Sequence, residues 1–277
     1  MKRVALRPLG VLLPFIILFG LFQLAPLVWV LCNSFINDDG QWSFSNYHNI
    51  LYSAFYIQAF EHSLTISLIS SLIGLFIAIL GCASLRHIKG QLRNMILAFT
   101  NMTSNFAGVP LAFAFIIILG FNGTLTLMLQ KLGWISGFNL YSSTGLTLIY
   151  SYFQIPLAML LLYPAFDALK QDWQESANLL GASQAYYWRR IALPVLNPAL
   201  LGTFIILLAN GLGTYATAYA LTSGNYNLVT IRIASLVSGD LFLEPNLAAA
   251  ISVLLIVLLM LITIVNQWLI KRSYHVN

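Results

Sequence analysis

The apolar run "ISVLLIVLLMLITIV", residues 251–265, decides the class of fold, because it carries no charged residue and shows no alternation of polar and apolar positions. Alternation is what a membrane β-barrel strand would require. The whole chain of 277 residues is 59% hydrophobic and only 8% charged, whereas soluble globular domains carry about 25% charged residues. The chain is therefore predicted to lie in lipid as helices, which pair their own backbone groups there.

Six stretches are long and apolar enough to cross a bilayer as helices, which takes about 20 residues each. They are residues 11–33, 62–85, 95–120, 145–168, 197–221 and 248–270. The first stretch exceeds the roughly 7–15 apolar residues of a signal peptide, so it is interpreted as a retained span. No internal repeat or separate soluble domain is visible. The sequence predicts an all-α membrane protein with one domain, residues 1–277.

Charged residues predict the topology of these spans. Eleven of the 13 basic residues lie on one side of the predicted membrane, and only Lys131 and Arg232 lie on the other. Basic residues favour the cytoplasmic side, so both termini are expected there. The outer loops hold the acidic residues Asp38, Asp39, Asp240 and Glu244. The basic character of the chain thus indicates topology rather than a nucleic-acid partner.

Polar side chains inside two predicted spans mark a candidate pathway. Asn101 and Asn105 lie four residues apart, on one helix face, and a second stripe lies in the fifth span. Such groups are costly in lipid unless they face water or a partner. They either line a pathway or bond to a neighbouring helix. The candidate pathway residues are Asn101, Asn105, Asn210, Thr214, Tyr215, Thr217 and Tyr219.

Several kinds of chemistry are missing from the sequence. No histidine or cysteine pair has metal-ligand spacing, and no nucleophile–base pair suggests a catalytic residue, so no metal site and no enzymatic activity are expected. The phosphate loop G-x-x-x-x-G-K-[ST] does not occur. Proton-coupled carriers usually need charges within their spans, and a secondary transporter would be expected to show repeats or such charges. A secondary transporter, which works without an ATPase, is kept as an alternative interpretation of a protein with these six spans.

The stretch "QDWQESANLLGASQAYYWRRIALP", residues 171–194, separates the fourth and fifth spans. Acidic residues lie early in it and two arginines lie late, which suits the dipole of a helix over about 172–188. Gly181 in the middle of a helix costs about 1 kcal/mol relative to alanine, and close approach of another backbone would offset that cost. The segment is predicted to be a docking helix on the cytoplasmic side.

The spacing Glu175-x-Ala177-x3-Gly181-x9-Ile191-x-Leu193-Pro194 resembles the EAA motif of permease subunits of ABC importers. Ser176 stands where the motif has its second-position alanine. The resemblance extends over the whole six-span chain, and it implies that the segment is a coupling helix bound by a separate ATP-binding subunit. The residues implied to dock are Glu175, Ser176, Ala177, Leu180, Gly181, Ile191, Leu193 and Pro194.

The same resemblance implies a location in the inner membrane of a bacterium, and it also implies the partners and the cargo. A second permease subunit, identical or a paralogue, would complete the pathway, and an external solute-binding protein would face loops 34–61 and 222–247. ATP and Mg²⁺ would be bound by the ATPase, so this chain needs no cofactor. Leu180 stands where sugar permeases often have aspartate, which favours the polyamine, sulfate, thiamine and iron branch. A polyamine such as spermidine or putrescine is the first candidate, followed by thiamine, sulfate, iron and phosphonate.

Overall fold

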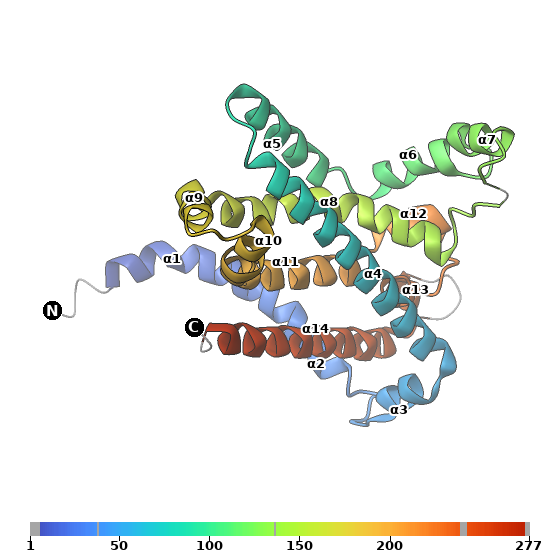
Figure 1. Cartoon of the computed structure of the whole chain (residues 1–277). Coiled ribbons are helices and arrows are strands. Elements are labelled where there is room, and N and C mark those ends of the chain that lie inside the picture. Colours follow the sequence, from blue (N-terminus) through green and yellow to red (C-terminus); the bar gives the residue numbers. More distant parts are fainter. Residues whose placement is uncertain (1–5, 38, 136, 239–242, 275–277) are drawn as a thin grey trace. The chain divides into compact units, whose positions relative to one another are not determined.

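A computed structural model describes residues 6–37, 39–135, 137–238 and 243–274 of the chain (Figure 1). Its helical elements are α1 (Leu6–Phe19), the π-helical η1 (Gly20–Leu24), α2 (Ala25–Asn33), α3 (Ser45–Tyr52), α4 (Ala54–Leu85), α5 (Gln91–Ser104), α6 (Val109–Leu119), α7 (Thr124–Lys131), α8 (Ser143–Asp167), α9 (Gln171–Leu179), α10 (Gln184–Tyr187), the π-helical η2 (Trp188–Ala192), α11 (Leu193–Gly213), α12 (Ala216–Thr222), α13 (Val229–Ser238) and α14 (Pro245–Tyr274). Within these ranges, extended pairing is confined to an isolated bridge between Ile36 and Trp42. The predicted all-α class is confirmed.

Six helical segments of the described chain are long and apolar enough to cross a membrane. They are Leu12–Asn33, Ala54–Leu85, Val109–Lys131, Ser143–Asp167, Gln184–Gly213 and Pro245–Trp268. Their number agrees with the predicted six-span architecture. Lys2, Arg3, Asp38 and Asp240, which contributed to the predicted topology, lie outside the described residues. The orientation of the termini stays a prediction.

Two of the expected spans are interrupted. Residues 95–120 do not form one helix, because α5 ends at Ser104 and α6 begins at Val109. Gly108 has a φ of +78°, a conformation that glycine adopts without steric cost. Pro110, which lacks an N–H group, suits the first turn of the next helix. A second break, at Thr214 and Tyr215, separates α11 from α12 within the expected span 197–221.

The contacts between residues divide the chain into two compact units. Unit 1 comprises the described residues of Met1–Ile57 and Arg232–Leu258, and unit 2 comprises those of Gln58–Ile231 and Leu259–Asn277. The single-domain organisation stays a prediction.

In unit 1, the stretch expected to be an outer loop from residue 34 onward contains α3 and the start of α4. The Nδ2 of Asn46 donates a hydrogen bond to the carbonyl oxygen of Ile36 at 2.8 Å. The hydroxyl group of Tyr47 donates to Ser34 Oγ at 2.7 Å, and its ring lies 5.2 Å from the ring of Phe35. These bonds and the ring contact tie residues 34–36 to α3.

In unit 2, α8 is shared by both parts of the hydrophobic core. α5 and α11 pack along α8, and α6 packs against α12 (Figure 1). One cluster of buried apolar side chains includes Leu146 and Ile149 of α8. The other includes Leu162 and Phe166, further along the same helix. α8 therefore connects the two clusters through continuous backbone.

Small and polar residues line the buried face of α4, as close packing in lipid requires. Gly74 lies so close to α8 that an added Cβ would be 3.0 Å from the Cβ of Gln154. At Gly211 in α11, an added Cβ would be 2.9 Å from Ser67 Oγ and 3.0 Å from Gln154 Nε2. Gln154 is fully buried, and its Nε2 donates to Ser70 Oγ at 3.2 Å. We call the contact of α4, α8 and α11 through Ser67, Gln154 and Gly211 the polar seam.

We expect Gly211→Ala to destabilise the protein by about 1–3 kcal/mol, because the added methyl group overpacks the polar seam. Gly202→Ala is the matched control, since it lies in the same helix and an added Cβ there would meet no atom within 4 Å. Thermal unfolding of the purified variants in mild detergent measures the difference. Equal midpoints for the two variants would show that the seam is not closely packed.

Candidate functional site

The predicted docking segment consists of two short helices, α9 and α10, rather than one. The N–H of Gly181 donates to the carbonyl oxygen of Asn178 at 2.9 Å, and the N–H of Ala182 donates to that of Ala177 at 2.9 Å. This pair of bonds closes a helix C-terminus when the residue after the cap is left-handed, and Gly181 has a φ of +81°. The expectation of one helix over 172–188 is therefore wrong.

The space around Gly181 also differs from the expected close packing. A Cβ added to Gly181 would meet no atom of this chain within 4 Å. Glycine is required there by its positive φ, which strains residues that have a Cβ. Contact of Gly181 with the backbone of a partner stays a prediction.

A hollow of about 610 Å³, which we call the motif hollow, opens where α9 ends. It is lined by Ala177, Leu180, Gly181, Ala182, Ser183, Tyr186 and Ile191. Four of the eight predicted docking residues are in this set. Leu179 and Leu180, at its edge, are 89% and 88% exposed. Exposed apolar side chains that gather beside a hollow are typical of a contact surface.

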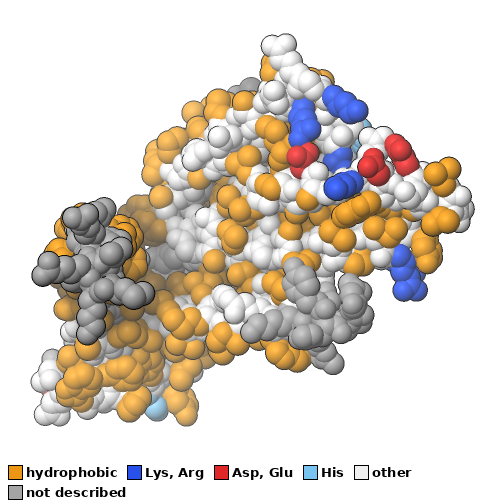
Figure 2. All heavy atoms as spheres, turned by 90° about the vertical axis from the view of Figure 1, so that its left-hand side faces the viewer, with side chains coloured by type: hydrophobic (Ala, Val, Ile, Leu, Met, Phe, Trp, Pro, Cys, Tyr) orange, Lys and Arg blue, Asp and Glu red, His pale blue; other side chains and the backbone are white. Residues whose placement is uncertain are grey.

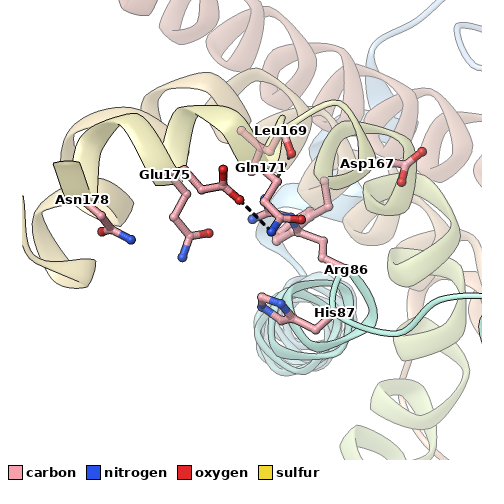
Figure 3. A pocket seen from close by; sticks show the side chains of 9 residues that line it. Arg86, His87, Asp167, Leu169, Gln171, Glu175 and Asn178 are labelled. Atoms are coloured by element: carbon pink, nitrogen blue, oxygen red, sulfur yellow. Dashed lines mark hydrogen bonds between the residues drawn. The ribbon is translucent and has the colours of Figure 1, made fainter.

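The other four predicted docking residues, Glu175, Ser176, Leu193 and Pro194, are exposed to solvent but do not line the motif hollow. Glu175 instead lines a polar pocket of about 280 Å³, which shares no lining residue with the motif hollow (Figure 3). Its Oε1 accepts a hydrogen bond from Gln171 Nε2 at 3.0 Å.

Arg86, just after α4, lines the same polar pocket as Glu175 (Figure 3). Its Nη2 donates to the carbonyl oxygen of Leu169 at 3.1 Å, which fixes the start of the docking segment to the end of α4. Arg93 of α5 pairs with Asp167 at the end of α8, with 2.7 Å between Nη2 and Oδ1. Figure 2 views the molecule from the left-hand side of Figure 1, and on the face it shows, most of the charged side chains gather in one part.

A second pocket, of about 340 Å³, lies where the two interrupted helices break. This pathway pocket is lined by Ser104, Ala107, Gly108, Phe153, Leu157, Asn210, Thr214, Tyr215, Ala216 and Thr217. It contains four of the seven candidate pathway residues, namely Asn210, Thr214, Tyr215 and Thr217. Sequence reasoning did not identify the contribution of α8, because Phe153 and Leu157 look like ordinary core residues.

The other three candidates do not line the pathway pocket. Asn105 Nδ2 donates to the carbonyl oxygen of Asn101 at 2.9 Å, so this amide group caps its own helix rather than bonding to a neighbour. Tyr219 lies outside the lining, with its ring centroid 5.3 Å from that of Tyr215. Whether any of the seven residues contacts a solute stays a prediction.

Side chains pair the backbone groups that the helix breaks leave free. The N–H of Gly108 donates to Thr217 Oγ1 at 2.9 Å, which joins the α5–α6 break to α12. The carbonyl oxygen of Thr214 accepts hydrogen bonds from Tyr150 at 3.3 Å and from Thr230 Oγ1 at 3.1 Å. The two breaks are thus held in defined positions beside the pathway pocket.

Comparison with known proteins identifies the family. Residues 70–273 match the profile of the family described as "Binding-protein-dependent transport system inner membrane component". The chain belongs to this family. The resemblance seen in residues 175–194 is thereby confirmed, and this transport component is a multi-pass protein of the inner membrane.

Individual relatives of the transport component are distant. It is 22% identical to the ferric transport system permease protein FbpB of Actinobacillus pleuropneumoniae, over 96% of this chain but only 39% of the relative. It is 21% identical to the spermidine/putrescine transport system permease protein PotC of Haemophilus influenzae, over 90% of this chain and 92% of PotC. The chain therefore spans about two fifths of the length of FbpB and nearly all of PotC.

A solved structure shares the fold of the transport component. A chain in the crystal structure of a bacterial ABC transporter for import of the acidic polysaccharide alginate superposes with a TM-score of 0.79 at 20% identity. The match covers 98% of this chain and 96% of that one. A likeness at 20% identity shows a shared fold only.

We expect Thr217→Val to destabilise the transport component by about 1–3 kcal/mol, because the Gly108 N–H would lose its acceptor in a partly buried place. Thr217→Ser, which keeps the hydroxyl group, should stay close to the unaltered protein. Thermal unfolding in detergent and hydrogen exchange of residues 105–110 measure the two effects. Unchanged exchange in Thr217→Val would contradict the role of this bond.

Proposed function

We propose that this chain is the membrane-spanning permease subunit of an ATP-driven importer and forms half of the translocation pathway. ATP and Mg²⁺ are bound by a separate ATPase chain, so the permease itself is not catalytic. A second permease subunit, identical or a paralogue, completes the pathway. An external solute-binding protein delivers the solute from the side of loops 34–61 and 222–247, and both termini are cytoplasmic.

The motif hollow is the observation that carries this proposal. Its lining combines Ala177, Leu180, Gly181 and Ile191, which are spaced as in the EAA motif. Beside it, Leu179 and Leu180 expose nearly their whole side chains, as residues that insert into a partner's cleft would. This combination favours a coupling segment bound by an ATPase over a segment that only packs beneath the helices.

The solute is proposed at two levels. The general class is a small solute that passes beside the breaks of α5–α6 and α11–α12. Within this class, a polyamine such as spermidine or putrescine is the first candidate, supported by the full-length similarity to PotC. Thiamine, sulfate, iron and phosphonate are the further candidates. A secondary transporter that works without an ATPase is the alternative mechanism.

We expect Gly181→Arg to abolish ATPase binding and transport, while the protein still inserts into the membrane. Arginine would strain the backbone at a φ of +81° and would place a cation in the motif hollow. The measurement is an affinity pull-down in mild detergent from native membranes, with bound chains identified by mass spectrometry. An ATPase should co-purify with the unaltered chain and be reduced at least tenfold with Gly181→Arg.

Gly133→Arg is the matched control, because Gly133 also has a positive φ of +70° and open space around it but lies outside the motif. It should retain the ATPase. An ATPase that binds Gly181→Arg normally would overturn the docking assignment. An unaltered chain that purifies alone would favour the secondary-transporter alternative.

A further inference from the structure

The lining of the pathway pocket has a distinct chemical character, which bears on the solute of the proposed importer. None of its ten lining residues is Asp, Glu, Lys, Arg or His. Its polar side-chain groups are the hydroxyl groups of Ser104, Thr214 and Thr217, the Asn210 amide and the Tyr215 phenol. A solute in this pocket would therefore meet hydrogen-bonding groups and an aromatic ring, without a fixed charge on this chain.

Two of the three Ser and Thr hydroxyl groups in the lining can only accept a hydrogen bond from a solute, and the third, Thr217 Oγ1, already accepts from the Gly108 N–H. Ser104 Oγ donates its proton to the carbonyl oxygen of Asn101 at 2.8 Å, and Thr214 Oγ1 donates to that of Asn210 at 2.6 Å. A hydroxyl group has one proton and two lone pairs. Once the proton is used within the helix, only lone pairs are left for a solute. A 3.5 Å contact from Asn105 Nδ2 occupies one lone pair of Ser104 and leaves the other.

The helix ends at the pocket carry partial charges of both signs, which offset one another. α5 and α11 end beside it, and α6 and α12 begin beside it. Helix C-termini carry partial negative charge and N-termini carry partial positive charge. Because both kinds of end are present, the side chains decide which solutes the pocket favours.

Tyrosine rings add a second feature that favours positive charge. Tyr215 is 37% exposed and lines the pocket, and Tyr219 beside it is 48% exposed. The face of an aromatic ring attracts an organic cation by about 0.5–2 kcal/mol, depending on how far the site excludes water. No lysine or arginine of the lining competes for these faces.

We infer that the pathway pocket passes an organic cation rather than an anion. This inference rests on the proposed importer function and narrows its substrate class. An ammonium group has donors and no acceptor, so it matches lone pairs and ring faces. An anion such as sulfate needs donors, which the Ser104 and Thr214 hydroxyl groups do not offer. The Asn210, Tyr215 and Thr217 side chains can donate, but the lining has no cationic group to balance the charge of an anion, and the negative ring faces disfavour it. Without a carboxylate the cation is held weakly, as a conducting site requires if the solute is to leave again.

A charge series at Ala107 tests the inference. Ala107 is an exposed pocket residue in the break between α5 and α6, so substitutions there do not interrupt a helix. Cells that lack the chromosomal gene are complemented with the unaltered chain, Ala107→Gln, Ala107→Lys or Ala107→Glu. Uptake is measured for the cations spermidine, putrescine and thiamine, for the anion sulfate and for neutral trehalose.

We expect at least one cationic probe, and neither sulfate nor trehalose, to depend on the unaltered chain. Ala107→Gln is the control for size. Ala107→Lys should lower cation uptake at least tenfold below Ala107→Gln, and Ala107→Glu should equal or exceed Ala107→Gln. Equal uptake by the lysine and glutamate substitutions would overturn the inference, as would chain-dependent uptake of sulfate or trehalose without any cation.

Co-purification of the ATPase with each variant distinguishes a failure of the cation inference from a failure of the importer proposal. An ATPase bound to the unaltered chain, with no cation uptake, overturns the cation inference and leaves the importer proposal standing. An unaltered chain that binds no ATPase overturns both. Where Ala107→Lys fails to retain the ATPase, the same series at Ala216, which lines the pocket from α12, provides the comparison.

Discussion

Every backbone polar group of this protein that lies in lipid must find a partner within the protein, and the rest of the structure depends on that requirement. Long helices meet it by themselves. The breaks between α5 and α6 and between α11 and α12 meet it with side chains. Thr217 accepts from the Gly108 N–H, while Tyr150 and Thr230 donate to the Thr214 carbonyl group. Irregular backbone is tolerated beside the pathway pocket because these partners are present.

The two candidate sites of unit 2 are connected through one helix. Phe153 and Leu157 of α8 line the pathway pocket. Further along the same helix, Phe166 and Asp167 line the polar pocket beside α9. The cluster around Phe166 also holds Ala177 of the docking segment. This cluster therefore joins α9 to the end of α8, and α8 extends from there to the pathway pocket.

Composition and residue spacing were enough to predict much of this arrangement. Long uncharged runs predicted six apolar spans, and the motif spacing singled out Ala177, Leu180, Gly181 and Ile191, which gather at the motif hollow, because both signals are local in sequence. The breaks were harder to predict. Gly108 and Pro110 signalled one of them, but the second arises where Thr214 is held by residues 64 positions before it and 16 after it.

Gly181 shows a different limit of the sequence. Its spacing within the motif was informative, but whether it continues or ends a helix depends on φ, which composition does not reveal. Likewise, the aliphatic Leu157 gives no sign that it faces a pocket, because a core residue and a pocket residue of that type look alike in sequence. Asn105 gives the opposite case, since its polar amide group donates to the carbonyl oxygen of Asn101 at the end of α5 and does not line the pathway pocket.

The polar seam has an evolutionary consequence. An added Cβ at Gly211 would lie 2.9 Å from Ser67 Oγ and 3.0 Å from Gln154 Nε2, so a larger residue at position 211 demands a smaller one at position 67 or 154. These positions are not free to drift independently. Distant relatives that preserve the fold at about 20% identity should therefore show correlated replacement at the equivalents of residues 67, 154 and 211.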